Sequence, residues 1–138
     1  MSEVGRTPRD TPPFERPSDP AAADRVVVSR LGAPLLRAHD ADGFLKRLRG
    51  LHAVPRLGPT DALILRSCFA IHTFGLSEPI DAVFLAHDGR ILKVARVPPG
   101  RVALCGGART VVELAAGTAA RLNLERGQVL SASTGRWS

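Results

Sequence analysis

The chain has 138 residues, 44% of them hydrophobic, which suits one domain with a buried core and is too short for two. Its 19 Lys and Arg against 13 Asp and Glu give a formal net charge of +6. Its apolar runs are far shorter than the roughly 20 residues that span a bilayer, and its start lacks the pattern of a secretory signal, so we expect a cytoplasmic protein with two reduced cysteines.

The first 24 residues differ in composition from the rest of the chain. They hold five of the 11 prolines, and three Arg against five acidic residues give them a net charge of −2. Such a segment buries too little apolar surface to offset the entropy that is lost on ordering. We therefore expect a disordered, Pro-rich tail over residues 1–24 and a single globular domain over residues 25–138.

The expected domain is basic, with 16 Lys and Arg against eight acidic residues, a net charge of +8. This charge can attract nucleic acid, acidic lipid or an anionic ligand. The basic residues are scattered, however, and no aromatic stacking platform accompanies them. We therefore expect an evenly charged surface rather than a nucleic-acid interface.

Apolar and β-branched runs bounded by turn residues predict seven or eight short strands. The candidate runs are residues 25–31, 34–38, 62–66 with a possible continuation over 68–74, 80–86, 91–97, 101–105, 110–114 and 128–132. Two helices complete the prediction. The first follows Asp40, a good N-cap, and has apolar residues at helical spacing up to Leu51; the second covers residues 118–122.

The clearest hairpin joins residues 80–86 to residues 91–97. Its connection contains Asp88-Gly89, the dipeptide that a two-residue type I′ turn favours. This turn predicts the facing pairs Leu85–Leu92, Val83–Val94 and Asp81–Arg96. The last pair would be an ion pair across the hairpin.

Hairpin connections dominate this pattern, and regular alternation of strands and helices is missing. The sequence therefore predicts an α+β fold with a mainly antiparallel sheet, curled towards a small barrel or sandwich, and two short helices.

Several spaced motifs occur together in one order. They are Arg49-Gly-Leu51 at a helix end, His72-Thr-Phe-Gly75, Pro79-Ile-Asp-Ala-Val-Phe84, Asp88-Gly-Arg90, and the run from Val112 to Leu122 followed by Gly127. Over about residues 26–130 the chain resembles the bacterial domain of unknown function 192 family. The resemblance implies a single compact α+β domain of mostly antiparallel strands, and no established activity.

The chain departs from the pattern of that family in two places. Relatives usually have Met and a basic residue where this chain has Leu76 and Ser77, and Asp where it has Gln128. If the family holds a ligand with those residues, this member has lost that function or keeps only the fold.

Cys68, His72 and Asp81 come closest to a catalytic set. On an extended strand Cys68 and His72 share one face but lie roughly 13 Å apart, or four rises of about 3.3 Å, which is too far for a thiolate–imidazolium pair. Only a turn or bulge would bring them together. We expect a half-buried histidine and an ion-paired aspartate, with a hydrolase or thiol-dependent enzyme using Cys68 or His72 as the alternative.

The cysteines and histidines show no paired-ligand spacing such as Cys-x-x-Cys, so we expect no metal and no cofactor. The Cys105-Gly106-Gly107 turn can present backbone N–H groups to an anion. His72 and Thr73 lie at a bent corner between Gly75 and Pro79 on one side and a strand on the other, where an imidazole can bind a ligand.

The sequence thus favours a non-enzymatic binding or interaction domain for a small anionic ligand or a partner segment. Its candidate ligand-binding residues are His72, Thr73, Asp81, Arg96, Cys105, Gly106 and Gly107. The alternatives are the enzyme named above and nucleic-acid binding through the Arg-rich surface, which would weaken steeply with salt.

Overall fold

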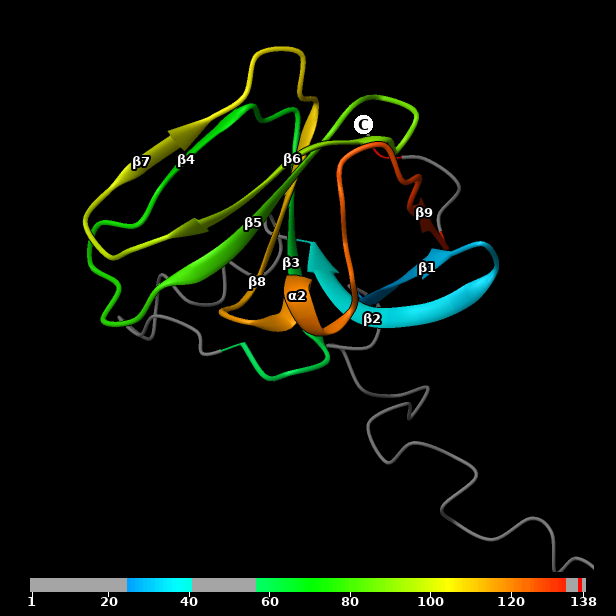
Figure 1. Cartoon of the computed structure of the whole chain (residues 1–138), viewed down its shortest axis with the longest axis horizontal. Helices are drawn as coiled ribbons and strands as arrows, with labels where there is room; N and C mark the ends of the chain where they lie inside the picture. Colours follow the sequence, from blue (N-terminus) through cyan, green and yellow to red (C-terminus); the bar gives the residue numbers. More distant parts are fainter. Residues whose placement is uncertain (1–24, 41–56, 134–136, 138) are drawn as a thin grey trace, which may run out of the picture.

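The computed structural model describes residues 25–40, 57–133 and 137 (Figure 1). Their elements are β1 (Arg25–Arg30), β2 (Ala33–Asp40), β3 (Asp61–Arg66), β4 (Ala70–His72), β5 (Ile80–Leu85), β6 (Ile91–Val97), β7 (Val102–Leu104), β8 (Thr110–Ala115), α2 (Thr118–Arg121) and β9 (Ser131–Ala132). Each expected strand is confirmed, although β4, β7 and β9 are shorter than predicted. The helix α2 is confirmed as well, whereas the helix expected after Asp40 falls outside the described residues.

Seven strands form one mixed sheet in the order β6-β5-β8-β3-β2-β1-β9. The neighbouring strands are antiparallel except β2 and β3, which run parallel. A parallel pair requires a long crossover connection, which here is residues 41–60. The prediction of a mainly antiparallel sheet is therefore correct only in part, because it omits this pair.

We expect a sheet curled towards a small barrel or sandwich, and the mixed sheet of the described residues is not closed into a barrel. Residues 127–132 run from one edge of the sheet to the other: Gly127 N–H donates to Ile91 O (2.8 Å) beside β6, and β9 pairs with β1. Between these points the chain makes a single bridge, Arg90–Val129, which does not extend into a ladder. The segment is too short and changes partner too soon to close the sheet.

Side chains of β5 alternate between the two faces of the sheet. Val83 and Leu85 belong to one buried cluster, which also contains residues of α2 and of the chain that follows it, such as Ala119 and Trp137. Phe84 belongs to a second cluster, together with Ile71 of β4. The chain from α2 onwards therefore covers one face, and β4 and β7 pack on the other.

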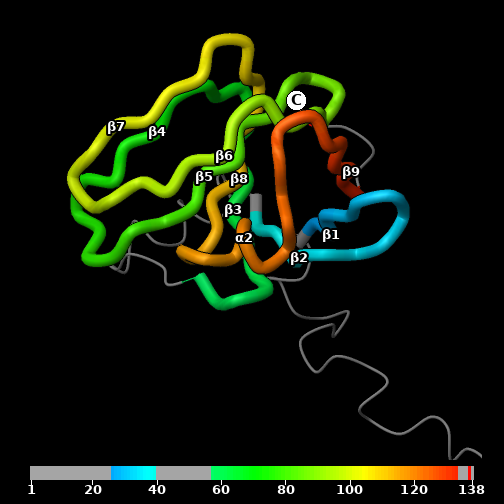
Figure 2. The backbone as a smooth tube through the Cα atoms, in the orientation of Figure 1, coloured from blue at the N-terminus to red at the C-terminus, as the bar shows by residue number. Residues whose placement is uncertain are grey.

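Strands β4 and β7 form a separate two-stranded antiparallel sheet, which we call the β4–β7 ribbon. Its facing pairs are Ala70–Leu104, Ile71–Ala103 and His72–Val102. Figure 2 shows this ribbon and the β1–β2 hairpin on opposite sides of the described fold. The ribbon is thus a distinct surface feature.

The β5–β6 hairpin has the expected register over most of its length. Its facing pairs include Asp81–Arg96, Val83–Val94 and Leu85–Ile91. The first two confirm the prediction. The third replaces the expected Leu85–Leu92 because a β-bulge lies between Phe84 and Leu85.

The turn of this hairpin differs from the expected type I′ turn. Ala86 N–H donates to Arg90 O (2.9 Å) and Gly89 N–H donates to Ala86 O (2.9 Å), so three residues form the loop. Gly89 has a φ of +89°, whereas Asp88 does not have the positive φ that a type I′ turn requires. The Arg90 N–H also donates to the Asp88 carboxylate (3.1 Å), which lowers the pKa of that exposed side chain.

In the described part of the chain, no helix has the length and apolarity required to cross a membrane. The tail expected over residues 1–24 lies outside the described residues. The tail and the cytoplasmic location therefore stay predictions.

Candidate functional site

Asp81 is a buried junction between three elements. Its Oδ1 accepts a hydrogen bond from Arg96 Nε at 2.8 Å, and its Oδ2 accepts from the backbone N–H groups of Gly117 (2.9 Å) and Ala119 (3.0 Å). The first turn of α2 has no cap from its own side chains, so the carboxylate satisfies N–H groups that a helix start leaves free. The expected ion pair is confirmed, and the bonds to α2 add to it.

His72 and Asp81 do not share a site. Asp81 and Val83 are two residues apart on β5 and therefore share one face of the sheet. This face is covered by α2. The ribbon that carries His72 packs on the opposite face, through Ile71 and Phe84. The sheet therefore separates the carboxylate and the imidazole.

Thr73 is fully buried and holds the corner between β6 and β7. Its hydroxyl donates to Pro98 O at 2.6 Å and accepts the Arg101 N–H at 2.8 Å. Its backbone carbonyl accepts the Gly100 N–H at 3.0 Å. The structure thus places this candidate residue inside the protein, where it stabilises a turn.

His72, in contrast, is exposed at the end of β4, so the expectation of a half-buried histidine is wrong. Its ring stacks on Phe74, with 4.9 Å between the ring centroids and 24° between the ring planes. Its Nδ1 accepts the backbone N–H of Phe74 at 3.2 Å. The bend after β4 therefore presents an aromatic pair to solvent.

The two cysteines are free thiols that are partly buried and pack against the second cluster. Cys68 Sγ donates to Ala70 O at 3.0 Å, and Cys105 Sγ to Gly106 O at 3.6 Å. Both thiols therefore donate to backbone carbonyls and not to an imidazole. This arrangement gives the thiol-enzyme alternative no added support.

The Cys105–Gly107 turn and His72 lie on the same ribbon but at opposite ends. His72 faces Val102, whereas Cys105 follows Leu104, so about three strand rises, or roughly 10 Å, separate them. Gly106 and Gly107 are exposed in the turn that leads to β8. The candidate residues therefore fall into three places: His72 with Thr73, the turn at Cys105, and Asp81 with Arg96.

The outstanding surface feature is a group of exposed apolar side chains on the ribbon. Four of the seven large hydrophobic side chains that are exposed among the described residues lie here, each 56–59% exposed: Phe69, Phe74, Val102 and Leu104. Together with His72 we call them the β4–β7 surface. Its signal in the sequence is a pair of apolar runs without polar alternation, which we interpreted only as strands.

Glu113 is a second feature that sequence reasoning missed. It lies on β8, the middle strand between β3 and β5, where it faces Leu63 on one side and Ala82 on the other. Its burial among these apolar neighbours raises the pKa of Glu113 from 4.5 to about 7. The signal in the sequence is a single acid within the apolar run Thr110–Ala115.

The raised pKa of Glu113 predicts a pH dependence of stability. Between pH 4.5 and about 7 the unfolded chain has released this proton while the folded chain still holds it, so the free energy of unfolding falls as pH rises. The full loss, reached above the folded pKa, is at most about 3 kcal/mol. Glu113→Gln should remove this dependence, leaving the variant more stable than wild type in mildly alkaline buffer and equally stable in acid.

Urea unfolding across this pH range measures the effect. Glu125→Gln, on an exposed turn, is the matched control and should retain the wild-type pH dependence. A Glu113→Gln variant that follows the wild-type pH dependence would show that the carboxyl is solvated.

Within residues 25–40, 57–133 and 137, no three His, Cys, Asp or Glu side chains gather in a way that could hold a metal ion. Gln128, one of the departures from the family pattern, accepts from Arg30 Nη1 (3.2 Å) and donates to Asn123 O (2.8 Å). In this chain it joins the end of β1 to the turn after α2.

Comparison with known proteins agrees with the order of the motifs. The model of the DUF192 family, described as an uncharacterized ACR, matches residues 27–132. A UPF0127 protein from Thermococcus sibiricus is 33% identical over an alignment of 96 residues, and the match covers 66% of this chain. The match spans 62% of the length of that relative.

Two crystal structures share the fold. A protein of unknown function from Novosphingobium aromaticivorans has a TM-score of 0.61 and 21% identity, with 78% of this chain and 83% of that chain covered. A candidate transcription regulator from Sinorhizobium meliloti has a TM-score of 0.62 and 22% identity, with 79% of this chain and 92% of that chain covered.

Proposed function

The chain belongs to the DUF192 family of uncharacterized proteins, and from its surface we propose that it is a non-enzymatic interaction module that binds an extended segment of a partner polypeptide on the β4–β7 surface. The observation that carries this proposal is the outer face of the ribbon, where Phe74, Val102 and Leu104 are each more than half exposed around His72. Contiguous exposed apolar surface marks interaction sites in soluble proteins.

The apolar side chains of the ribbon divide between two faces. Ile71 is buried against the second cluster, so its neighbours in the ladder point the other way. His72 and its partner Val102 therefore lie on the outer face, as does Leu104. Phe74 extends this face through its stack on His72.

The outer edge of β4 favours a polypeptide partner. Thr73 N–H donates to Arg101 O and Cys105 N–H donates to Phe69 O, so residues 69, 71 and 73 turn their backbone groups towards β7. The intervening residues, Ala70 and His72, turn theirs away from β7. An extended partner can pair with such an edge and place alternate side chains on the apolar face.

In this proposal the Asp81–Arg96 pair has a structural role and does not bind the partner. The Asp81 carboxylate is 3% exposed and already accepts bonds from three donors. A ligand there would have to displace the start of α2. We therefore assign binding to the ribbon rather than to this pair.

Selection of peptides tests the proposal. A displayed library of random peptides of about a dozen residues is selected on the full chain, and the bound peptides are measured by fluorescence polarisation. The triple variant Phe74→Ser, Val102→Ser and Leu104→Ser should lose at least about tenfold in affinity, because it removes the desolvated anchors of the interface. Since all three side chains are already exposed, the variant should stay folded.

Leu31→Ser is the matched control, because Leu31 is 98% exposed in the β1–β2 turn, away from the ribbon (Figure 1). It should bind the selected peptides as wild type does. Recovery of no peptide, or peptides that bind the triple variant and wild type equally, would contradict the proposal. A dimer in sedimentation that the triple variant abolishes would instead assign the surface to a second copy of the chain.

A further inference from the structure

Resting on the proposed function, we infer that the partner segment is acidic, with Asp or Glu interspersed among its apolar side chains. The ribbon has an exposed apolar face with cations at its rim. The two stretches of sequence that form it contain no acidic residue. This complementarity selects one class of partner.

The two stretches of sequence that form the ribbon contain no acidic residue. Residues 62–77, which include β4, contain one Arg, and residues 89–112, which include β7, contain five Lys and Arg. The neighbouring acids along the chain are Asp61 and Glu78 on one stretch, and Asp88 and Glu113 on the other. Arg96 is already paired with Asp81, so the positive local potential at the ribbon comes from the other cations of the second stretch.

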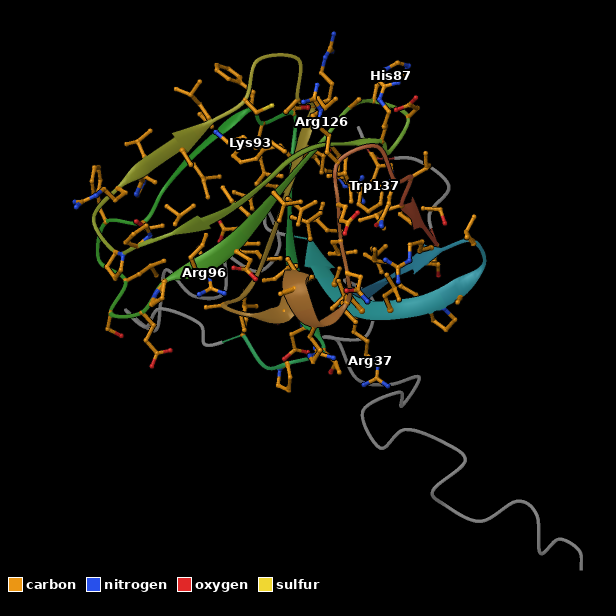
Figure 3. All side chains as sticks on the ribbon, viewed as in Figure 1. Arg37, His87, Lys93, Arg96, Arg126 and Trp137 are labelled. Atoms are coloured by element: carbon orange, nitrogen blue, oxygen red, sulfur yellow. The ribbon has the colours of Figure 1, made fainter. Side chains whose placement is uncertain are left out.

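Three of these cations are tied to the ribbon by their own contacts. Lys93 Nζ donates to Leu104 O at 3.0 Å, beside an exposed apolar side chain, and Figure 3 labels it next to β7. Arg101 directly precedes Val102, and Arg109 O accepts the Cys68 N–H at 3.1 Å. All three side chains are exposed, so their charges are accessible at the rim of the ribbon.

An acidic peptide fits this pattern better than a lipid surface does. Both would meet the cations and the apolar side chains, but only a peptide can also pair with the backbone of the outer edge of β4 at His72. Opposite charges at the rim of an interface steer association and reject partners of the same charge. The cations therefore determine which segments bind, while the apolar face supplies the contact area.

The composition of the selected peptides tests the inference. Peptides selected on wild type should be net acidic, and the tightest of them should lose about tenfold in affinity when its Asp and Glu are replaced by Asn and Gln. The double variant Arg101→Glu and Arg109→Glu should lose a similar factor for the acidic peptide and much less for the amide form. Its fold should persist because the backbone groups of these residues, which bond to Thr73, Leu85 and Cys68, are retained.

Arg126→Glu is the matched control, since Arg126 is exposed in the turn at residues 126–127. The residues on either side of this turn, Leu124 and Leu130, pack on the other face of the sheet. It should leave the affinity unchanged, and the affinity of wild type should fall with added salt. Neutral or basic peptides that need the apolar face but ignore the charge variant would overturn this inference while the proposed function stands. Binding to vesicles that contain phosphatidylserine, with no acidic peptide selected, would overturn it in favour of a lipid surface.

Discussion

Replacing Gly89 with alanine is expected to lower the free energy of unfolding by about 3 kcal/mol or more, measured by urea denaturation, because backbone strain and overpacking add. The φ of +89° already disfavours an L side chain, and an added Cβ would collide with Leu130 O and lie 2.6 Å from Trp137 Nε1. These atoms form a hydrogen bond of 2.8 Å with each other, in a buried region. The methyl group would therefore push a buried indole and a backbone carbonyl out of place.

Gly32→Ala separates the two causes. Gly32 has a similar φ of +82°, but no atom lies within 4 Å of its added Cβ. It should cost only about 1–2 kcal/mol, the penalty of the left-handed conformation alone. Equal losses for the two variants would mean that the C-terminal chain does not pack on the β5–β6 turn.

Replacing Asp81 with alanine is expected to cost about 2–4 kcal/mol, because two backbone N–H groups at the start of α2 lose their acceptor in a buried place. Arg96→Gln should cost less than about 1 kcal/mol, because that side chain is 55% exposed and an exposed ion pair contributes little. The two partners of one ion pair should therefore differ in their effect on stability.

Urea denaturation of both single variants and of the double variant measures this difference. Under conditions in which the Asp81→Ala variant is folded, it should bind the selected peptides with the affinity of wild type. Equal losses of stability for Asp81→Ala and Arg96→Gln would show that the carboxylate serves Arg96 rather than the helix.

The β5–β6 hairpin shows what the sequence can predict. The expected two-residue turn at Asp88-Gly89 predicts Asp81 opposite Arg96, and the structure confirms this pair although the turn between the strands is of another type. A three-residue loop would shift the pairing by one residue, and the bulge between Phe84 and Leu85 restores it. The hydrophobic pattern therefore fixes the register, because a slip would turn every buried side chain to the other face.

The features that sequence reasoning missed depend on long-range contacts. The parallel pairing of β2 and β3 has no local signature, because the expected helix between them is equally compatible with an antiparallel fold. The cap that Asp81 provides for α2 joins residues 36 and 38 positions apart. The raised pKa of Glu113 likewise requires both neighbouring strands to be in place.

The candidate site was predicted only in part for the same reason. The chemistry of its side chain makes His72 a candidate, and the structure places it on an exposed face. Its apolar neighbours on that face, Val102 and Leu104, come from about 30 residues further along the chain. Thr73 carries the same kind of side chain as many ligand-binding residues. Its burial against Pro98 and Arg101 could not be read from its immediate neighbours.

The proposed function places recognition on the ribbon and leaves the Asp81–Arg96 pair as part of the scaffold. Amide chemical-shift changes on adding the tightest selected peptide to the ¹⁵N-labelled chain test this assignment most directly. The largest changes are predicted in residues 69–74 and 102–109, with Asp81, Gly117 and Ala119 unaffected. Changes centred on those three residues, with the ribbon unaffected, would contradict it.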